Sequence, residues 1–201
     1  MLQPLIALLY AGTQQSAHFS AASSGMFLLI IAIGIAGYIV QARLQSVFKK
    51  YSKVQFPGGL TGAQVAEKML RENNIHNVKV THVAGHLTDH FNPQTMTVNL
   101  SDSVYNSTSV AAAAVAAHEC GHAVQHARDY APLTLRSQLV PVVQFASSAA
   151  TWVILLGLVL LATTRNELVC WIGVALIAMS ALFSLITLPV EYNASARALE
   201  W

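Results

Sequence analysis

The sequence predicts a mainly α-helical membrane protein, with three transmembrane helices and one small polar α+β domain. Of its 201 residues, 54% are hydrophobic and only 10% are charged, whereas about 25% of an average soluble domain is charged. Three long apolar stretches contain no charged residue. About 20 apolar residues suffice for a helix to cross a bilayer. The chain is long enough for several such spans and one domain of ordinary size.

Net charge and cysteine content exclude two other classes of protein. A formal net charge of +2 gives little electrostatic basis for binding nucleic acid, and no cation-rich stretch alternates with aromatic residues. We therefore expect no nucleic-acid partner. The cysteines are Cys120, inside a helical motif, and Cys170, inside an apolar run. Neither suits the structural disulfide of a secreted domain, so a reducing compartment is expected.

The first predicted span covers residues 23–42, because residues 26–40 are apolar and no charged residue precedes Arg43. Residues 1–22 begin with a short apolar segment that lacks the basic region of a signal peptide, so we interpret them as an N-terminal tail. Lysines and arginines next to a span remain on the cytoplasmic side of the membrane. Four follow this span closely, namely Arg43, Lys49, Lys50 and Lys53. We therefore expect a multi-pass protein of the plasma membrane whose polar domain faces the cytoplasm.

Residues 43–136 have the composition of a small globular domain. Its first helix is predicted from a capping-box pattern, in which Thr61 is followed by Gln64 three residues later. Apolar residues then recur on one face until the helix ends near Asn73. The domain thus begins with a short amphipathic helix.

The rest of the polar domain contains two predicted strands and a second helix. Residues 78–83 and 95–100 alternate as half-buried strands do, and the segment between them has the glycine and proline of a loop. Residues 107–130 are rich in alanine and begin with serine and threonine, which predicts a capped helix.

The last predicted element is a transmembrane hairpin over residues 137–190. Its two helices are free of charge, and the sequence TTRNE, residues 163–167, forms the tight turn between them. Pro189 is expected to end the second helix of the hairpin. Residues 191–201 then suit the start of a new helix.

The sequence AHECGHAVQH, residues 117–126, contains the pattern H-E-x-x-H. Residues four apart lie on one face of a helix, so His118 and His122 can bind one metal ion. Glu119 is turned about 100° from His118 and can approach a water molecule on that ion. This arrangement is typical of zinc peptidases, in which the glutamate is the general base.

Two residues are candidates for a third zinc ligand. His126 continues the spacing, but on an unbroken helix it lies about 12 Å along the axis from His118, too far for ligand atoms that must lie within about 2.3 Å of the ion. Glu191 follows the hairpin, which should return it to the face of the membrane on which His118 lies. We expect one Zn²⁺ bound by His118, His122 and Glu191, and we interpret Cys120 as a packing residue.

The chain resembles the YugP-like neutral zinc metallopeptidases of bacterial membranes in the segments LTDHFNPQTMTVNL, AAHECGHAVQH and LPVEYNASARAL. The resemblance implies a membrane zinc peptidase with a zincin-like domain. It also implies that the chain is truncated at Trp201, since members of the family continue to a further apolar segment. Its order of motifs is similar to that of CAAX prenyl proteases and HtpX proteases, whose third ligand opens an E-x-x-A-D string. Here Ser195 replaces that aspartate, which leaves open which group orients a ligand histidine.

The predicted reaction is hydrolysis of peptide or membrane-protein substrates, with Glu119 as general base. The strand at 95–100 would be an edge strand that pairs with substrate, or alternatively an ordinary internal strand. Three residues could donate to the oxyanion, with Arg197 ranked ahead of His90 and Tyr192. His82, His86 and His90 share the four-residue spacing, but we interpret them as loop and surface residues.

Two other functions remain possible from the sequence. A zinc-binding membrane scaffold or chaperone-like protein would need no open metal position, whereas three good ligands favour an open one. An intramembrane site-two protease would carry H-E-x-x-H inside a span, but the helix after His118 soon reaches Gln125, Arg128 and Asp129. The sequence does not indicate an oligomeric state.

Overall fold

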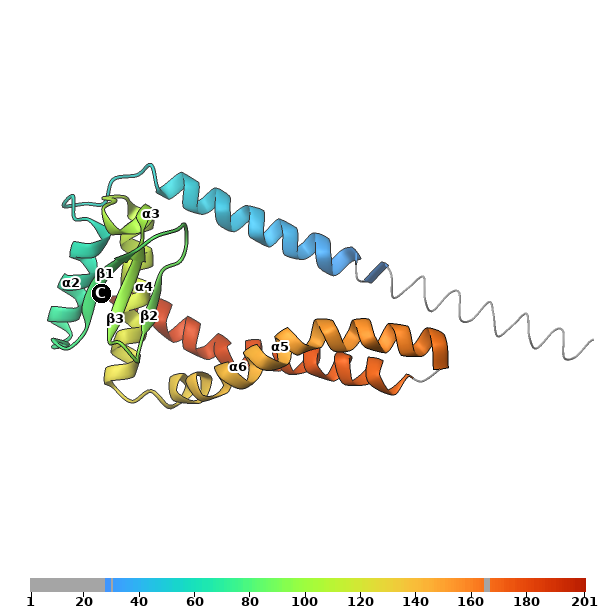
Figure 1. Cartoon of the computed structure of the whole chain (residues 1–201). Coiled ribbons are helices and arrows are strands. Elements are labelled where there is room, and N and C mark those ends of the chain that lie inside the picture. Colours follow the sequence, from blue (N-terminus) through green and yellow to red (C-terminus); the bar gives the residue numbers. More distant parts are fainter. Residues whose placement is uncertain (1–27, 30, 165–166) are drawn as a thin grey trace, which may run out of the picture. The chain divides into compact units, whose positions relative to one another are not determined.

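The computed structural model describes residues 28–29, 31–164 and 167–201. The chain divides into two compact units, the first ending at Tyr51 and the second beginning at Ser52 (Figure 1). The first unit contains an apolar helix, Ile31–Tyr51, that is long enough to cross a membrane. The predicted N-terminal tail and the beginning of the predicted first span lie outside the described residues.

The second unit begins its regular structure with helix α2, Gly62–Glu72. Its capping box forms as predicted, because the Thr61 hydroxyl accepts from the Gln64 amide at 3.3 Å and the Gln64 side chain accepts from the Thr61 amide at 2.9 Å. The face that carries Val65, Met69 and Leu70 is fully buried. Helix α2 thus covers one side of the core of the domain.

The sheet has three strands, β1 (Lys79–Val83), β2 (His90–Asn92) and β3 (Thr97–Ser101), in the order β1-β3-β2. Strand β3 pairs parallel with β1 and antiparallel with β2. The prediction that residues 95–100 form an edge strand is therefore wrong, since β3 lies between two neighbours. Strand β2, placed in a loop by the sequence, is one edge of the sheet.

Helix α3, Asp102–Tyr105, is a single turn that leads into helix α4, Val110–Ala127. The predicted serine cap of α4 is confirmed, because Ser109 Oγ accepts from the Ala112 amide at 3.2 Å. The alanines on α4 let α2 and β3 pack closely against it, and they form the core with Val98 and Leu100. Helix α4 is thus held at the centre of the domain.

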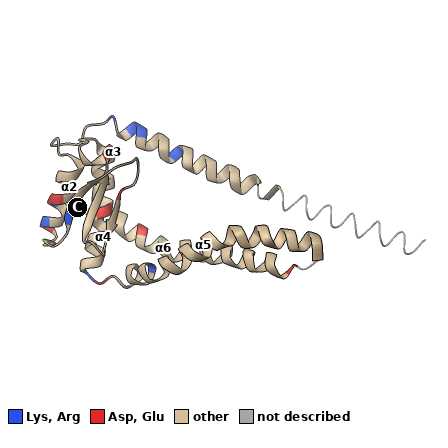
Figure 2. Cartoon of the chain, viewed as in Figure 1, with Lys and Arg blue, Asp and Glu red and all other residues tan. Residues whose placement is uncertain are grey.

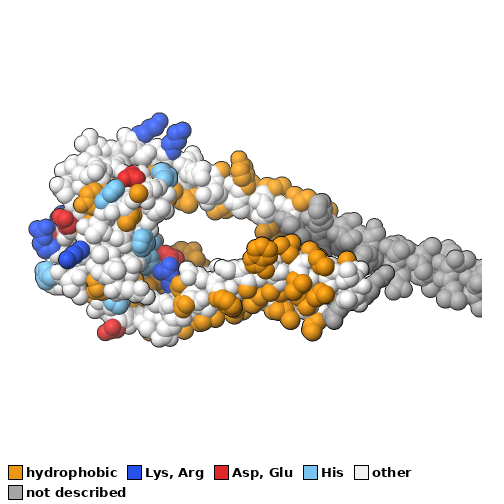
Figure 3. All heavy atoms as spheres, in the orientation of Figure 1, with side chains coloured by type: hydrophobic (Ala, Val, Ile, Leu, Met, Phe, Trp, Pro, Cys, Tyr) orange, Lys and Arg blue, Asp and Glu red, His pale blue; other side chains and the backbone are white. Residues whose placement is uncertain are grey.

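Helices α5 (Ala131–Thr164) and α6 (Leu168–Glu200) form the predicted hairpin. Together with Ile31–Tyr51 they are the three candidate membrane spans among the described residues. Figure 2 shows that most of the length of both helices carries no charged side chain, and Figure 3 shows hydrophobic side chains gathered there. The predicted fold class, mainly helical with three long apolar helices and a small sheet, is confirmed.

Pro189 does not end the second helix of the hairpin, contrary to the sequence-based expectation. Helix α6 continues through Pro189 to Glu200, just as α5 continues through Pro141. A proline removes one backbone donor, and long apolar helices tolerate this where neighbouring groups and small local adjustments compensate. Glu191 therefore lies within α6, one of the two helices of the apolar hairpin.

Small residues let the two hairpin helices pack closely. A side chain at Gly157 would lie 2.8 Å from the Cys170 backbone nitrogen, and the hydroxyls of Ser147 and Ser180 are 2.6 Å apart. Small and hydroxyl-bearing residues are common where helices pack inside membranes. Cys170 thus has a packing position, and both cysteines are free thiols.

Candidate metal centre

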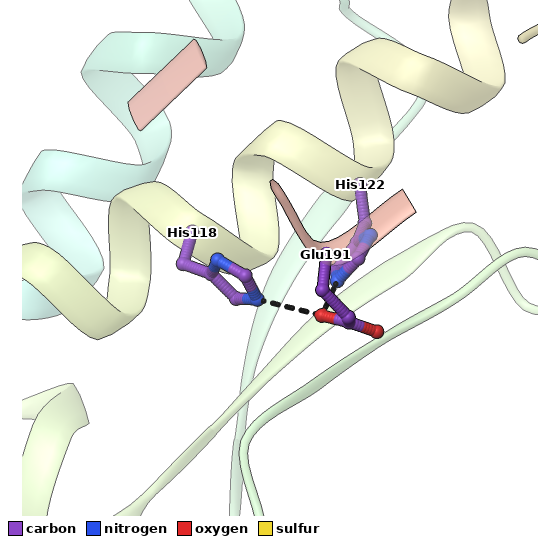
Figure 4. A group of neighbouring side chains, drawn as sticks. All are labelled: His118, His122 and Glu191. Carbon is purple, nitrogen blue, oxygen red and sulfur yellow. Dashed lines mark ion pairs between the residues drawn. The ribbon is translucent and has the colours of Figure 1, made fainter. Parts of the chain in front are cut away.

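Three side chains that the sequence nominated as ligands meet at one point. His118 and His122 project from consecutive turns of α4, and Glu191 reaches them from α6 (Figure 4). Glu191 Oε2 lies 3.3 Å from His118 Nε2 and 3.4 Å from His122 Nε2. Two ligands on a tetrahedral zinc ion are about 3.3 Å apart, so the donor types and these two separations suit Zn²⁺.

His126 lies outside this group. The three ligand atoms lie within 4.8 Å of one another, and across the described residues no other set of histidine, cysteine, aspartate or glutamate has such spacing. The His126 ring instead packs against Phe91, with ring centroids 5.7 Å apart. The continued helix moves His126 away, as the helical rise predicts.

Gly121 allows α6 to come close enough for Glu191 to reach the histidines. A side-chain carbon at Gly121 would lie only 2.5 Å from the Ala194 carbonyl oxygen, and Ala194 is fully buried. Real Cβ atoms essentially never approach another atom so closely, and the obstacle is backbone. The glycine inside the H-E-x-x-H motif therefore sets the distance between α4 and α6.

Gly121→Ala is expected to separate α4 from α6. Overpacking of this kind costs about 1–3 kcal/mol, which exceeds the gain in helix propensity of about 1 kcal/mol. We expect a lower melting temperature and weaker zinc binding, measured by thermal unfolding and by competition with a chromogenic chelator. Gly37→Ala is the control, because a side chain there meets no atom of the described residues within 4 Å. Unchanged zinc affinity in Gly121→Ala would contradict this account of the helix contact.

Each ligand histidine is also held through its second ring nitrogen. Ser195 Oγ lies 3.1 Å from His118 Nδ1, and Gln125 Oε1 lies 3.0 Å from His122 Nδ1. When Nδ1 carries the proton and donates to these oxygens, the lone pair of Nε2 is directed at the metal position. Ser195 thus occupies the orienting position that the sequence left open.

Gln125 also connects the candidate metal ligands to the backbone of α6. Its Nε2 donates to the Val190 carbonyl at 2.8 Å and to Asn193 Oδ1 at 3.0 Å, and the side chain is fully buried. The same side chain that orients His122 therefore fixes the turn of α6 that carries Glu191. Buried polar groups satisfied in this way hold one defined arrangement.

Ser195→Ala is expected to weaken zinc binding by about 10–100-fold, the usual cost of losing a partner of a ligand histidine. Ser184→Ala on the same helix is the control, since among the described residues its hydroxyl donates to the Ser180 carbonyl alone, at 3.1 Å. Zinc affinity is measured for both by competition titration in detergent. Equal affinities would show that Ser195 does not orient His118.

Glu119 lies beside the metal position but is not part of the three-ligand group. Its Oε2 accepts from the Phe91 backbone amide at 3.1 Å, and this contact connects α4 to strand β2. Burial raises the pKa of the Glu119 carboxyl, while the Glu191 carboxylate raises the pKa of the His118 imidazole by accepting its hydrogen bond. A buried carboxylate with a raised pKa is suited to accept a proton near neutral pH.

Cys120 packs in the core and lies outside the three-residue group. Its side chain is fully buried, its sulfur lies 3.6 Å from the Ala66 carbonyl, and burial raises the pKa of its thiol. Metal binding requires the thiolate, which this apolar environment disfavours.

A pocket of about 190 Å³ opens beside the three ligands. One wall comes from strand β2 and its flanks, and the other from the first turns of α5. Its lining residues, besides His118, Glu119, His122 and Glu191, are Asp89, His90, Phe91, Pro93, Leu133, Arg136 and Ser137.

The three residues predicted as possible hydrogen-bond donors to the oxyanion lie in different places. Arg197 does not line this pocket; it lines another one with Met69 and donates to Asn193 Oδ1 at 2.8 Å. Tyr192 is 69% exposed and is also absent from the lining. His90 lines the pocket, but its ring nitrogens contact the Thr88 carbonyl at 2.8 Å and Asn99 Nδ2 at 3.1 Å.

Sequence reasoning missed Arg136. It is the one lysine or arginine in the described lining of the pocket, and its Nη2 lies 3.4 Å from Glu191 Oε1. In the sequence, Arg136 is the last charged residue before a long apolar run. That position marks the start of the predicted hairpin but does not by itself indicate a place in the pocket.

The other histidines form no second metal site in the described parts of the chain. His82 lies in β1 and contacts Asp102 Oδ1 at 2.6 Å. The hydrogen bond from the Gly85 amide and then that from His82 hold the pKa of Asp102 below its usual value. These contacts fix the loop after β1 rather than prepare a metal site.

Comparisons with known proteins agree with this geometry. A family model described as "Putative neutral zinc metallopeptidase" matches residues 26–201. A relative from Bacillus subtilis (strain 168), described as "Putative membrane protease YugP", is 43% identical over 173 residues, which cover 86% of this chain and 75% of the relative. No solved structure matches the chain.

Proposed function

Because the chain belongs to the neutral zinc metallopeptidase family, we propose that it is a membrane-anchored enzyme that hydrolyses peptide bonds. The single observation that carries this proposal is the convergence of His118, His122 and Glu191, with Glu119 beside them. Three protein ligands leave a fourth position open, as catalytic zinc sites do, whereas structural sites are closed by four.

In this proposal His118, His122 and Glu191 would hold Zn²⁺, with His118 Nε2, His122 Nε2 and Glu191 Oε2 as the atoms that already converge. A zinc ion there supplies Lewis acidity, which lowers the pKa of a water molecule towards about 7 and polarises a carbonyl group. Arg136 Nη2 lies 3.4 Å from Glu191 Oε1, which would leave Oε2 to hold the ion.

Glu119 is proposed as the general base. It accepts a proton from the attacking water and later donates it to the leaving amine. The Phe91 amide fixes one carboxylate oxygen, and the neighbouring pocket provides space for the substrate carbonyl.

Arg136 is proposed as the donor to the developing oxyanion. It lines the pocket and retains further N–H groups besides the one near Glu191. Arg197 is not retained in this role, because it lines a different pocket.

The proposed partners are peptide or membrane-protein substrates and the lipid bilayer. An extended peptide would lie along the edge strand β2, whose residues line the pocket. The cations in and just after the last turns of the first apolar helix support a plasma-membrane protein whose metal centre faces the cytoplasm.

Metal analysis and a cleavage assay test this function. The chain purified in detergent is expected to contain one zinc ion and to cleave casein. A chelator should abolish cleavage, and equimolar Zn²⁺ should restore it. One bound zinc without cleavage of either soluble casein or a membrane-anchored casein segment would instead favour a zinc-binding membrane scaffold.

A further inference from the structure

The metal centre lies where both hairpin helices leave their charge-free stretches. Residues 137–164 of α5 and 168–190 of α6 carry no lysine, arginine, aspartate or glutamate. The first charges on the domain side of these stretches are Arg136 and Glu191. These two side chains form an ion pair at 3.4 Å. The boundary of the apolar hairpin and the metal centre are therefore at one level.

The length of α6 gives the depth of this level. Counted from Leu168, which follows the charged turn residue Glu167, Glu191 lies about 35 Å along the helix. The hydrocarbon layer is about 30 Å thick, and the bilayer with its headgroups about 40–45 Å. A tilt of about 20° shortens the distance by only about 2 Å. With Leu168 at one boundary of the hydrocarbon, Glu191 lies a few ångströms beyond the opposite boundary, at the depth of the headgroups.

The exposed side chains of α6 change at the same level. Leu182, Leu185 and Leu188, which precede Glu191 in α6 on the side of the hairpin turn, are exposed apolar residues. Tyr192 directly follows Glu191 and is 69% exposed. Tyrosine is enriched at the interface between membrane and water, so its exposure here agrees with the depth from helix length.

We propose that the substrates are membrane-anchored polypeptides, cut in the short segment next to their own transmembrane span. This inference rests on the proposed function. An extended chain advances about 3.3 Å per residue, so a peptide leaving the hydrocarbon reaches the metal centre within a few residues. The pocket opens between β2 and the first turns of α5, where Arg136 marks the membrane boundary.

Spin labels at successive positions on α6 test the depth of the metal centre in the bilayer, and they require no enzymatic activity. Cysteines replace Leu182, Leu188 or Leu199, all exposed, in a Cys170→Ser background where Cys120 is buried. In lipid nanodiscs, collisions with oxygen and with a water-soluble nickel chelate report depth. Helix rise places the three labels about 9 Å inside the hydrocarbon boundary, at it, and about 16 Å outside it. A Leu188 label with the full water accessibility of the Leu199 label would overturn the inference.

Anchored substrates test the cleavage position. One substrate joins a casein-derived unfolded segment directly to a single span, and another inserts an uncleavable spacer of about 30 residues. In nanodiscs containing the full chain we expect the direct substrate to be cut at least about tenfold faster. Mass spectrometry should place the cuts within about ten residues of the span.

Soluble casein separates the two proposals. If zinc-dependent cleavage of soluble casein occurs while both anchored substrates are cut equally, the inference about juxtamembrane substrates is wrong and the proposed peptidase function stands. If neither soluble nor anchored casein is cut by the zinc-loaded protein, the peptidase function itself is wrong.

Discussion

Glu119→Gln is expected to abolish peptide hydrolysis while leaving zinc bound. An amide cannot accept the proton of the attacking water, and general-base catalysis typically contributes about 10²–10⁴-fold to a rate. The amide oxygen can still accept from the Phe91 backbone amide, as Glu119 Oε2 does at 3.1 Å. The change therefore removes the proton acceptor with little change in shape. Casein cleavage and zinc content are measured on the same preparation.

Glu67→Gln is the matched control, because Glu67 is exposed on α2 and does not line the metal-centre pocket. It should retain both activity and zinc. Casein cleavage by Glu119→Gln at the rate of the parent would assign the base to another group. Loss of zinc from that variant would assign Glu119 to metal binding instead.

Glu191→Ala is expected to lose zinc far more severely than the ligand-orienting variants. Glu191 Oε2 lies 3.3 Å from His118 Nε2 and 3.4 Å from His122 Nε2. Its loss removes a proposed direct ligand, so the decrease in zinc affinity should exceed the 10–100-fold typical of an orienting partner. It also leaves Arg136 without its carboxylate partner, which adds positive charge next to the metal position.

His126→Ala tests whether the third zinc ligand is His126 or Glu191, the two candidates from the sequence. Since the His126 ring packs on Phe91 and lies outside the ligand group, its loss should leave zinc content unchanged. The two variants are compared by metal analysis after dialysis against a weak chelator. Normal zinc in Glu191→Ala, together with loss in His126→Ala, would reverse our assignment.

Local sequence patterns predicted the features whose causes lie within a few residues. Thr61 and Gln64 cap α2 as expected, and Ser109 caps α4. The periodicity of the α-helix placed His118 and His122 on one face, and the charge-free runs marked the hairpin. The same methods failed for β2, because a three-residue strand is too short to show alternation. The prediction that Pro189 ends the second hairpin helix was also wrong, because α6 continues to Glu200.

The sequence by itself was enough to predict the shared helix face of His118 and His122, the adjacent Glu119, the apolar helices and the family resemblance. Tertiary structure alone decided that β3 is central and β2 an edge, that Ser195 and Gln125 hold the ligand rings, and that Arg136 lines the pocket. The sequence could nominate Glu191, but only the contact between α4 and α6 places it beside the histidines. Spacing along one helix fixes its own geometry, whereas residues about seventy positions apart are brought together by packing, here at Gly121 and Ala194.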